Sequence, residues 1–527
     1  MFRSCPIAIS RPLPFAVNDM DFLRWLKSLT LDDDAKGCEQ LLHILLTLNK
    51  TPIAGKTKLF ILDKLTPVLF QLTARITSQP AVNQNLHPFE DENTVFEFSI
   101  WGCAELANGY KLLSLEESFK KNTYYSQQQK SLVITHGIQA LGRALLYTSQ
   151  LYSQPYAAFW SDCFHFYRLA HHNETINYNG DVIANAFKHV LVFYLSHSNQ
   201  FSPQEMRVVH TLLGQYGVYA KLLRNVPEKR FRGIPYIHLR RDIPPSILDE
   251  AIDKDDPYIL HVATAEVASK VLDAAYDKEL KHPYTDQLML LRLAKTLTSN
   301  SGRKHERMKV NDPCLAVTNF DHLVDYLRKQ ELENSYAANV KGYVDFKGTG
   351  ALHKISASLG SSFGRKSINT GENSATWSSG AQNAADTRVN LIDKSKNGWG
   401  LVWPNKRIKP KVGNIIGLQQ QKLAIGFIRW LSQSEETDII LGVELVGINA
   451  QAIKISNPGF PDTEIDAIYL PREESSQQAE SVLLLNNGFS PDEYIFIKKE
   501  HKSSRYRQMK QLHSTAFLNR YQIVEAH

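Results

Sequence analysis

The chain has 527 residues, of which 43% are hydrophobic and 22% are charged. These values exclude a chain that is disordered over most of its length, and the length predicts about three domains. The formal net charge is only +6, which excludes a polycationic nucleic-acid binder of the histone type, so any anion site must come from a local cluster. No apolar run reaches the roughly 18 residues of a transmembrane helix, so the sequence predicts no membrane span.

The five cysteines are far apart in the sequence and form no Cys-x-x-Cys pair. An odd number of scattered cysteines predicts neither a disulfide framework nor a structural zinc site. The 18 histidines show no metal-ligand spacing either. Free thiols are typical of the cytosol, and the first residues are too broken by Arg and Pro for a secretory signal. We therefore expect a cytoplasmic protein without a bound metal.

Residues 1–225 are predicted to form an irregular all-α region. Leucines recur at helical spacing in 41–46 and again in 59–72. Pro67 lies inside the second stretch and predicts a kink or a break in that helix. The sequence Ser-Pro-Gln-Glu at 202–205 is typical of a capping box with proline in the first helical turn. No fixed sequence period is present, so a regular helical repeat is not predicted.

Residues 226–302 are predicted to be a connector followed by two helices. Five prolines between 227 and 257 exclude a helix there. Helical spacing of apolar residues returns at about 260–280 and 285–299. Basic residues with two aromatic side chains among them occupy 227–242. Such a run allows a nucleic-acid site, but a solvated linker is its commoner explanation.

From about Thr387 the apolar residues recur with a period of two, which predicts strands. Large apolar side chains alternate with other residues at 399–403 and at 441–445. Many short strands in succession predict an antiparallel sheet that is closed or nearly closed. The preceding 348–386 is rich in Ser, Gly, Asn and Ala, so we expect a flexible loop there, within an insertion at about 329–386.

Two short motifs flank this insertion. The first has two arginines four positions apart and comes just before a predicted strand at 308–319. The second has the form Asp-x-Ser-x-x-Gly and follows a predicted strand at 387–392. Guanidinium groups bind phosphate or guanine in bidentate fashion, a carboxylate accepts guanine N–H groups, and glycine lets the backbone approach a ligand closely. The motif residues are Arg303, Arg307, Asp393, Ser395 and Gly398.

With these motifs and the strands that follow them, residues 303–525 resemble the PilZ domain, a bacterial receptor module for cyclic di-GMP, followed by an extra β-module. The resemblance implies an α+β multidomain protein, in which an irregular all-α N-terminal region is followed by a PilZ-like antiparallel β-barrel with an extra C-terminal β-module. The expected division is a helical domain at 1–225, a connector with helices at 226–302, the barrel with its insertion at 303–465, and the β-module at 466–527.

The resemblance also implies a function. The five motif residues would bind cyclic di-GMP, with no other cofactor, and the helical region would couple this binding to an unidentified protein partner. The family places such partners in motility, pilus or surface-attachment machinery. Arg307 and Asp393 are 86 positions apart, further than is usual in the family, and the insertion accounts for the excess.

The alternative is a scaffolding protein with a degenerate PilZ-like domain that no longer binds nucleotide. A nucleic-acid binder that uses 227–242 is a third, less favoured hypothesis. An enzyme is not predicted, since neither GxxxxGK[ST] nor HExxH occurs in the sequence. One GxSxG match at 360–364 lies in the low-complexity loop rather than between a strand and a helix, so we interpret it as chance.

Overall fold

The protein is described by a computed structural model. It divides into two compact units. Unit 1 comprises Met1–Glu306 with Trp430–Ile440, and unit 2 comprises Arg307–Arg429 with Leu441–His527. The structure describes residues 12–29, 34–78, 94–120, 124–176, 181–224, 234–247, 256–277, 287–298, 307–344, 386–404, 410–433, 438–457, 460–473, 478–485, 494–499, 502–515 and 518–526.

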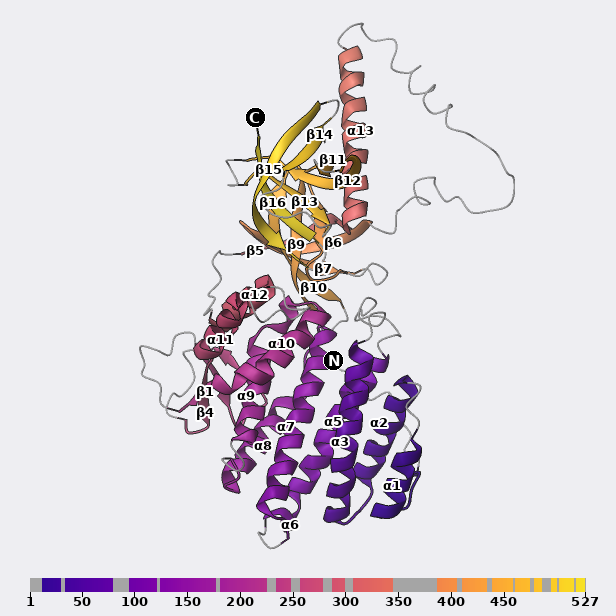
Figure 1. Ribbon diagram of the computed structural model, residues 1–527, viewed down its shortest axis with the longest axis vertical. Coiled ribbons are helices and arrows are strands. Elements are labelled where there is room, and N and C mark those ends of the chain that lie inside the picture. Colours follow the sequence, from indigo (N-terminus) through magenta and orange to yellow (C-terminus); the bar gives the residue numbers. More distant parts are fainter. Residues whose placement is uncertain are drawn as a thin grey trace, which may run out of the picture. The chain divides into compact units, whose positions relative to one another are not determined.

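Unit 1 consists mainly of α-helices, coloured from indigo to magenta in Figure 1. Three of them are long, namely α3 (Gly55–Ser78), α5 (Thr94–Leu115) and α7 (Gln127–Gln150), and α5 packs against the other two. The predicted helical character of residues 1–225 is confirmed, apart from a short strand at their end, β1 (Lys221–Leu223). The remaining helices are α1 (Asp19–Ser28), α2 (Asp34–Lys50), α6 (Glu117–Lys120), α8 (Phe159–His172), α9 (Val182–Leu195) and α10 (Pro203–Tyr216), with 3-10 turns at Ser198–Gln200 and Gly217–Tyr219.

Local signals explain where α10 begins, whereas α3 departs from its local signal. The Ser202 hydroxyl accepts a hydrogen bond from the backbone N–H of Glu205 (3.3 Å), and the Glu205 carboxylate accepts one from the N–H of Ser202 (2.8 Å), so the predicted capping box is confirmed. Helix α3 continues through Pro67, so the predicted break does not occur. Leu65 and Leu69 on either side are buried, and this packing outweighs the local cost of proline.

The predicted connector contains a small sheet as well as two helices. Its four strands are ordered β1-β4-β2-β3. Proline is tolerated at the ends of strands, and Pro235 is the first residue of its strand, so the prolines that exclude a helix do not exclude a sheet. The elements are β1 (Lys221–Leu223), β2 (Pro235–His238), β3 (Ser246–Ile247), β4 (Ile259–Ala263), α11 (Ala265–Tyr276) and α12 (Gln287–Thr298).

Unit 2 contains the predicted antiparallel barrel. Its six strands close in the order β10-β7-β6-β5-β8-β9, and the tip of the β9–β10 hairpin is grouped with unit 1. Alternate side chains point inward and form the core, including Leu391, Leu401, Trp403 and Leu418. The strands are β5 (Met308–Thr318), β6 (Asp386–Ser395), β7 (Gly398–Trp403), β8 (Ile415–Gln419), β9 (Leu423–Gln433) and β10 (Ile439–Ile448).

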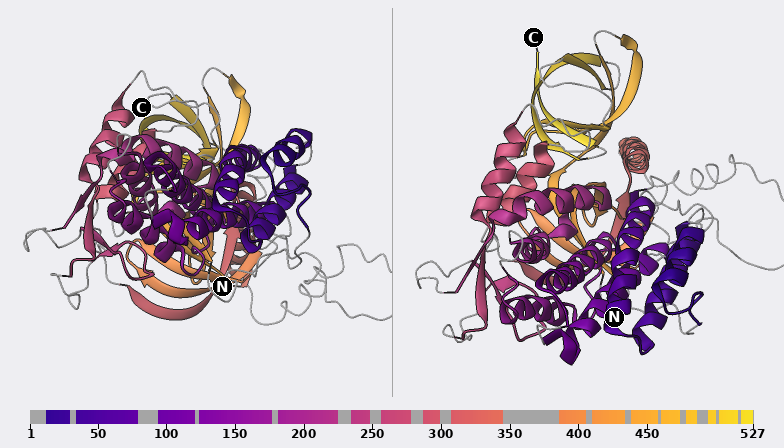
Figure 2. Two further views of the ribbon diagram at one scale, coloured as in Figure 1. Left: turned by 90° about the horizontal axis from the view of Figure 1, so that it is seen from below. Right: turned by 60° about the horizontal axis from the view of Figure 1, so that its bottom comes forward.

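The extra C-terminal β-module is a second closed barrel of six strands, ordered β11-β12-β13-β16-β15-β14. Its yellow strands form a ring in the right-hand view of Figure 2. It begins at Gln451 rather than at 466, because β11 pairs with β12 and β14 of this barrel. The strands are β11 (Gln451–Asn457), β12 (Phe460–Leu470), β13 (Ser481–Leu485), β14 (Tyr494–Lys499), β15 (Lys502–Ser514) and β16 (Leu518–Glu525).

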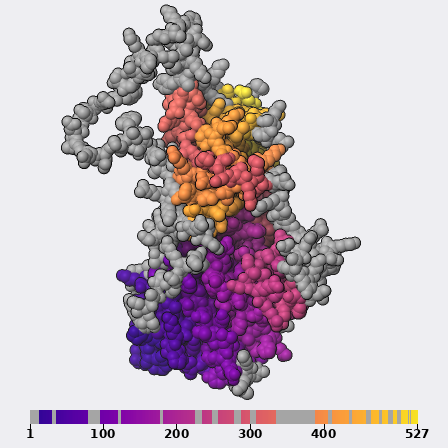
Figure 3. Space-filling model, turned by 180° about the vertical axis from the view of Figure 1, so that it is seen from behind, coloured from indigo at the N-terminus to yellow at the C-terminus, as the bar shows by residue number. Residues whose placement is uncertain are grey.

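Helix α13 (Phe320–Val344) fixes the two barrels of unit 2 to each other. It contacts β5 and β8 of the first barrel and β11 and β12 of the second, and Figure 3 shows it against the orange strands. Leu323 and Leu327 of its first turns are buried in one apolar core with side chains of both barrels. Arg328 adds an ion pair with Asp466 of β12.

The start of the predicted insertion is helical, because α13 extends to Val344. Residues 345–385, which hold most of the expected loop and the GxSxG match, lie outside the described residues.

Among the helices that the structure describes, none is both long enough and apolar enough to cross a membrane.

Candidate functional site

The Asp-x-Ser-x-x-Gly motif forms the turn between β6 and β7. Asp393 and Ser395 end β6, and Gly398 begins β7 directly opposite Ser395. The Ser395 hydroxyl donates a hydrogen bond to the carbonyl oxygen of Gly398 (3.0 Å). A Cβ atom at Gly398 would lie 3.1 Å from the carbonyl oxygen of Val443 on β10, so the neighbouring strand leaves little room for a larger residue. The motif therefore makes a tight and exposed hairpin end.

Arg307 is bound to this hairpin by an ion pair. Its Nη1 atom lies 2.8 Å from both carboxylate oxygens of Asp393, and the two side chains are 26% and 22% exposed. The pairing of β5 with β6 explains the contact, because it places Lys309 opposite Asp393 and so brings Arg307 to the same end of the ribbon. Residues 86 positions apart thus meet. Arg303, the other arginine of the predicted motif, lies outside the described residues.

Gly400 is a further residue of this site that sequence reasoning missed. It lies opposite Asp393 on β7. A Cβ atom there would be only 2.7 Å from Asp393 Oδ1 and 2.9 Å from its Cγ. Only glycine therefore leaves room for the carboxylate in its present position. The second glycine of Gly398-Trp399-Gly400 was the available signal, but a strand sequence alone does not tell which side chain lies across from it.

Lys394 and Trp399 lie on the opposite face of the same hairpin. They are paired across the strands, and paired residues point to one side of a ribbon while their chain neighbours point to the other. The Lys394 ammonium lies 5.4 Å above the Trp399 ring. It also donates to Asp312 Oδ2 (3.0 Å) and to Gln420 Oε1 (2.8 Å). The hydrogen bond from Lys394 to Asp312 is the main reason why the pKa of Asp312 is lowered.

We call the surface formed by Arg307, Asp393, Ser395, Gly398 and Gly400 the motif face. It offers a permanent cation, a carboxylate and a hydroxyl around a glycine-lined turn. Partly exposed ion pairs contribute roughly 0–1 kcal/mol, so a ligand with phosphate and amide groups can replace the contact between Arg307 and Asp393 at little cost. Strand pairing also shifts register between Leu391 and Asp393, and such bulges often re-aim side chains beside functional sites. Among the described residues, no group of three or more His, Cys, Asp or Glu is arranged to hold a metal ion.

Comparison with known protein families gives two matches. Residues 20–228 match the model described as the N-terminal domain of the cyclic-di-GMP receptor FimW. Residues 328–452 match the model described as the middle PilZ domain of the same receptor. The two matches together cover more than half of the chain, and the second includes the whole β6–β7 hairpin but neither arginine of the first motif. No curated protein and no solved structure matches.

Proposed function

The chain belongs to the FimW family of cyclic-di-GMP receptors, and we propose that it binds cyclic di-GMP at the motif face of the β6–β7 hairpin and couples this binding to a protein partner through its helical unit. The contact between Arg307 and Asp393 is the observation that supports the proposal most strongly. It joins the two predicted motifs across 86 positions of sequence. Both matched family descriptions name a receptor, which agrees with a role in binding rather than in catalysis.

Each group of the motif face has a role in this proposal. The guanidinium of Arg307 binds a phosphate or the O6 and N7 atoms of a guanine. Asp393 accepts N–H groups of a guanine edge, and Ser395 turns its hydroxyl from the Gly398 carbonyl to a phosphate oxygen. Gly398 and Gly400 let the ligand approach the backbone. Arg303 supplies a second guanidinium from the segment that precedes β5.

The ligand changes the partners of Arg307, and this change is the proposed signal. In the structure the guanidinium is held by Asp393. A bound phosphate competes for it and draws the preceding segment, which includes Arg303, onto the ligand. Arg307 is the first residue of unit 2, and the chain before it belongs to unit 1. Because the ligand binds more tightly when both arginines contact it, it shifts the population of the chain toward that arrangement and so acts on the helical unit.

A calorimetric titration of the full chain with cyclic di-GMP tests the ligand. We expect the double substitution Arg303→Ala with Arg307→Ala to weaken binding at least tenfold, since hydrogen bonds to charged groups contribute about 1.5–3 kcal/mol. Lys510→Ala, at an exposed lysine of the second barrel, is the matched loss of charge and should leave affinity unchanged. The proposal fails if the unmodified chain gives no binding heat, or if the double variant binds as tightly as the unmodified chain.

One observation favours the alternative of a scaffolding protein without nucleotide binding. Arg307 already has a carboxylate partner within the protein, so the motif face is satisfied without a ligand. Capture of partner proteins from cell lysate separates the two functions. A receptor predicts that cyclic di-GMP changes the set of captured proteins and that the arginine double variant abolishes this change. A scaffold predicts the same captured proteins with and without the ligand and in both forms of the chain.

A further inference from the structure

A large hollow lies beside the β6–β7 hairpin, within unit 2. Its volume is about 1170 Å³, and β5, β6, β7, β10 and the β8–β9 turn contribute to its wall. The residues that carry the argument are Arg388, Lys394, Trp399, Gln419, Gln420 and Lys422. We call this hollow the barrel pocket. None of the five predicted motif residues is among those that line it.

Strand alternation turns Lys394 and Trp399 of the barrel pocket away from the motif face, whereas Arg388 lies further along β6, beside Leu315 and Gln419. Asp393 is paired with Gly400, and Lys394 is paired with Trp399. Successive residues of a strand point to opposite faces. The contacts agree, since Asp393 binds Arg307 whereas Lys394 binds Asp312 and Gln420 of the pocket wall. A ligand in the barrel pocket therefore uses different side chains from a ligand on the motif face.

The charge of the barrel pocket is positive. Asp312 offsets the charge of Lys394 and fixes its position beside the Trp399 ring. Arg388 and Lys422 also line the pocket and are exposed. Within the described part of the chain, no ion pair involves either of these two cations. Two exposed cations without a carboxylate partner favour a ligand that brings its own negative charge.

The remaining wall fits a planar ring with a polar edge. Trp399 is only partly buried, so a base can stack on the part of its ring that Lys394 leaves uncovered. The side-chain amides of Gln419 and Gln420 already bond to other groups of the protein. Each amide has two N–H groups and two lone pairs, so it can still donate to and accept from the edge of a purine. Leu445 and Ile448 supply an apolar side. Small-molecule sites combine these elements, namely an apolar wall, a few fixed polar groups and a volume of several hundred Å³.

We propose that the barrel pocket is a second ligand site, which binds a phosphorylated purine nucleotide with its base on Trp399 and its phosphates between Arg388 and Lys422. The proposal does not depend on the motif face, because the two sites share no side chain. Two sources have this chemistry, namely a guanine or adenine mononucleotide and a second molecule of cyclic di-GMP. An acidic peptide satisfies the cations but leaves the ring and the amides unused.

Calorimetric titrations of the full chain with GTP, ATP, cyclic di-GMP and inorganic phosphate test the proposal. We expect a nucleotide site that is weakened about tenfold by Arg388→Ala with Lys422→Ala, and by a similar factor by Trp399→Leu, whereas Trp399→Phe keeps most of the affinity. Lys510→Ala and Asp393→Asn are the controls. The first removes a charge elsewhere, the second alters only the motif face, and both should leave this site unchanged.

The outcomes distinguish the sources and the two proposals. Binding of GTP or ATP identifies a mononucleotide, and two molecules of cyclic di-GMP per chain, of which one is sensitive to Trp399→Leu, identify a second cyclic di-GMP. If no cyclic di-GMP binding depends on Asp393 while nucleotide binding still depends on Trp399, the proposed function is contradicted and the barrel pocket proposal stands.

The barrel pocket proposal is overturned if no nucleotide binds, or if the double cation variant binds every nucleotide as tightly as the unmodified chain. It is also overturned if a glutamate-rich peptide occupies the pocket and nucleotides do not displace it. The double cation variant changes only exposed side chains, so it stays informative if Trp399→Leu fails to fold.

Discussion

Asp393 and Lys394 are adjacent in the chain, yet they take part in different polar clusters. One binds the arginine that precedes β5, and the other binds a carboxylate and an amide of the barrel pocket. The cause is the alternation of a strand, which sends neighbouring side chains to opposite faces. A motif of six residues therefore contributes to two separate surfaces, and its second residue, Lys394, is not a spacer.

Gly400→Ala is a prediction at the residue scale. The new methyl group would have to displace the Asp393 carboxylate, which lies 2.7 Å from the Cβ position, and so remove it from Arg307. We expect cyclic di-GMP affinity to fall about tenfold in a calorimetric titration, because a charged hydrogen-bonding group is misplaced.

A glycine in ordinary surroundings is the control for this substitution. At Gly214 in α10 a Cβ atom would meet the His189 ring at 3.4 Å, which is normal contact. Gly214→Ala should leave ligand affinity unchanged, and it should stabilise α10 by up to about 1 kcal/mol because alanine is the better helix former. Unchanged affinity in Gly400→Ala would contradict a role for Asp393 in ligand binding.

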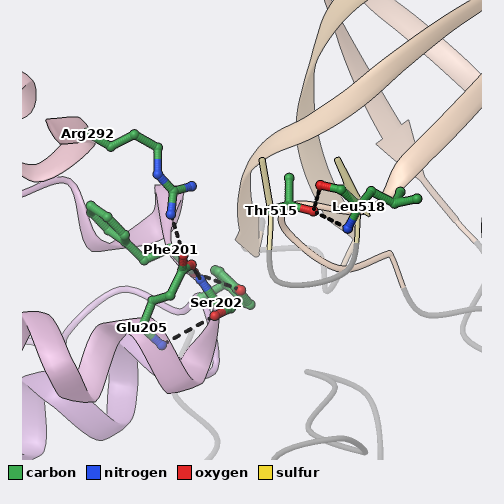
Figure 4. Close-up of polar contacts among 7 residues, drawn as sticks. Phe201, Ser202, Glu205, Arg292, Thr515 and Leu518 are labelled. Carbon is green, nitrogen blue, oxygen red and sulfur yellow. Dashed lines mark hydrogen bonds and ion pairs between the residues drawn. The ribbon is translucent and has the colours of Figure 1, made fainter. Parts of the chain in front are cut away.

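At the scale of a single element, helix α10 is held at its first turn by two interactions that share Glu205. Its carboxylate closes the capping box with Ser202 and also pairs with Arg292 of α12 (Figure 4). Arg292 in turn lies over the Phe201 ring, 5.1 Å from its centre. One side chain thus joins a local helix signal to a contact between elements 87 positions apart.

Substitutions at this turn should separate the local contribution from the long-range one. Glutamine can still accept the cap hydrogen bond but cannot pair with Arg292, so we expect Glu205→Gln to destabilise α10 less than Glu205→Ala. Ser202→Ala should cost about 1 kcal/mol through loss of the cap. Hydrogen exchange of the α10 amides measures these effects within one unit, and Gln204→Ala at an exposed position is the control. Equal effects of Glu205→Gln and Glu205→Ala would show that the capping box contributes nothing.

At the scale of the whole molecule, buried histidines are present in both units. Burial is the main reason why the pKa of His165 in unit 1 and that of His513 in unit 2 are each lowered to about 4. Burial also lowers the pKa of other histidines, namely His136, His189, His210 and His261. The folded chain therefore holds many imidazoles in the neutral form.

These histidines predict a loss of stability in mild acid. Between about pH 6.5 and pH 4 the unfolded chain takes up protons at histidine that the folded chain does not, so the free energy of unfolding falls as the pH falls through this range and is insensitive to these groups above it. The raised pKa of Asp162, caused mainly by burial, opposes this trend only in part. We expect a clearly lower Tm at pH 5.0 than at pH 7.5.

A variant identifies the source of this acid sensitivity. His165→Gln removes one buried imidazole, so the difference in Tm between the two pH values should shrink. His172→Gln changes an exposed histidine at the end of the same helix and is the matched control. Equal Tm values at pH 5.0 and pH 7.5 in the unmodified chain would contradict the prediction.

The features that the sequence by itself determined are those with local causes. Helical spacing of leucines, the capping box at Ser202 and the change to a period of two after Thr387 depend on residues a few positions apart, and each predicts its element correctly. The order of the two motifs, together with the strands after them, was enough to identify the PilZ-like barrel, which the family matches confirm. Local hydrogen bonding and side-chain periodicity do not require knowledge of distant partners.

Only the tertiary structure decided which distant residues meet. The pairing of β5 with β6 brings Arg307 to Asp393, the register of β6 and β7 places Gly400 beneath that carboxylate, and the partners of β11 assign it to the second barrel. Packing likewise keeps α3 continuous through Pro67. These outcomes depend on contacts between segments far apart in the chain, whose strength comes from burial and register rather than from any local preference. For that reason the two motifs are visible in the sequence, whereas the position of their side chains relative to the barrel pocket is not.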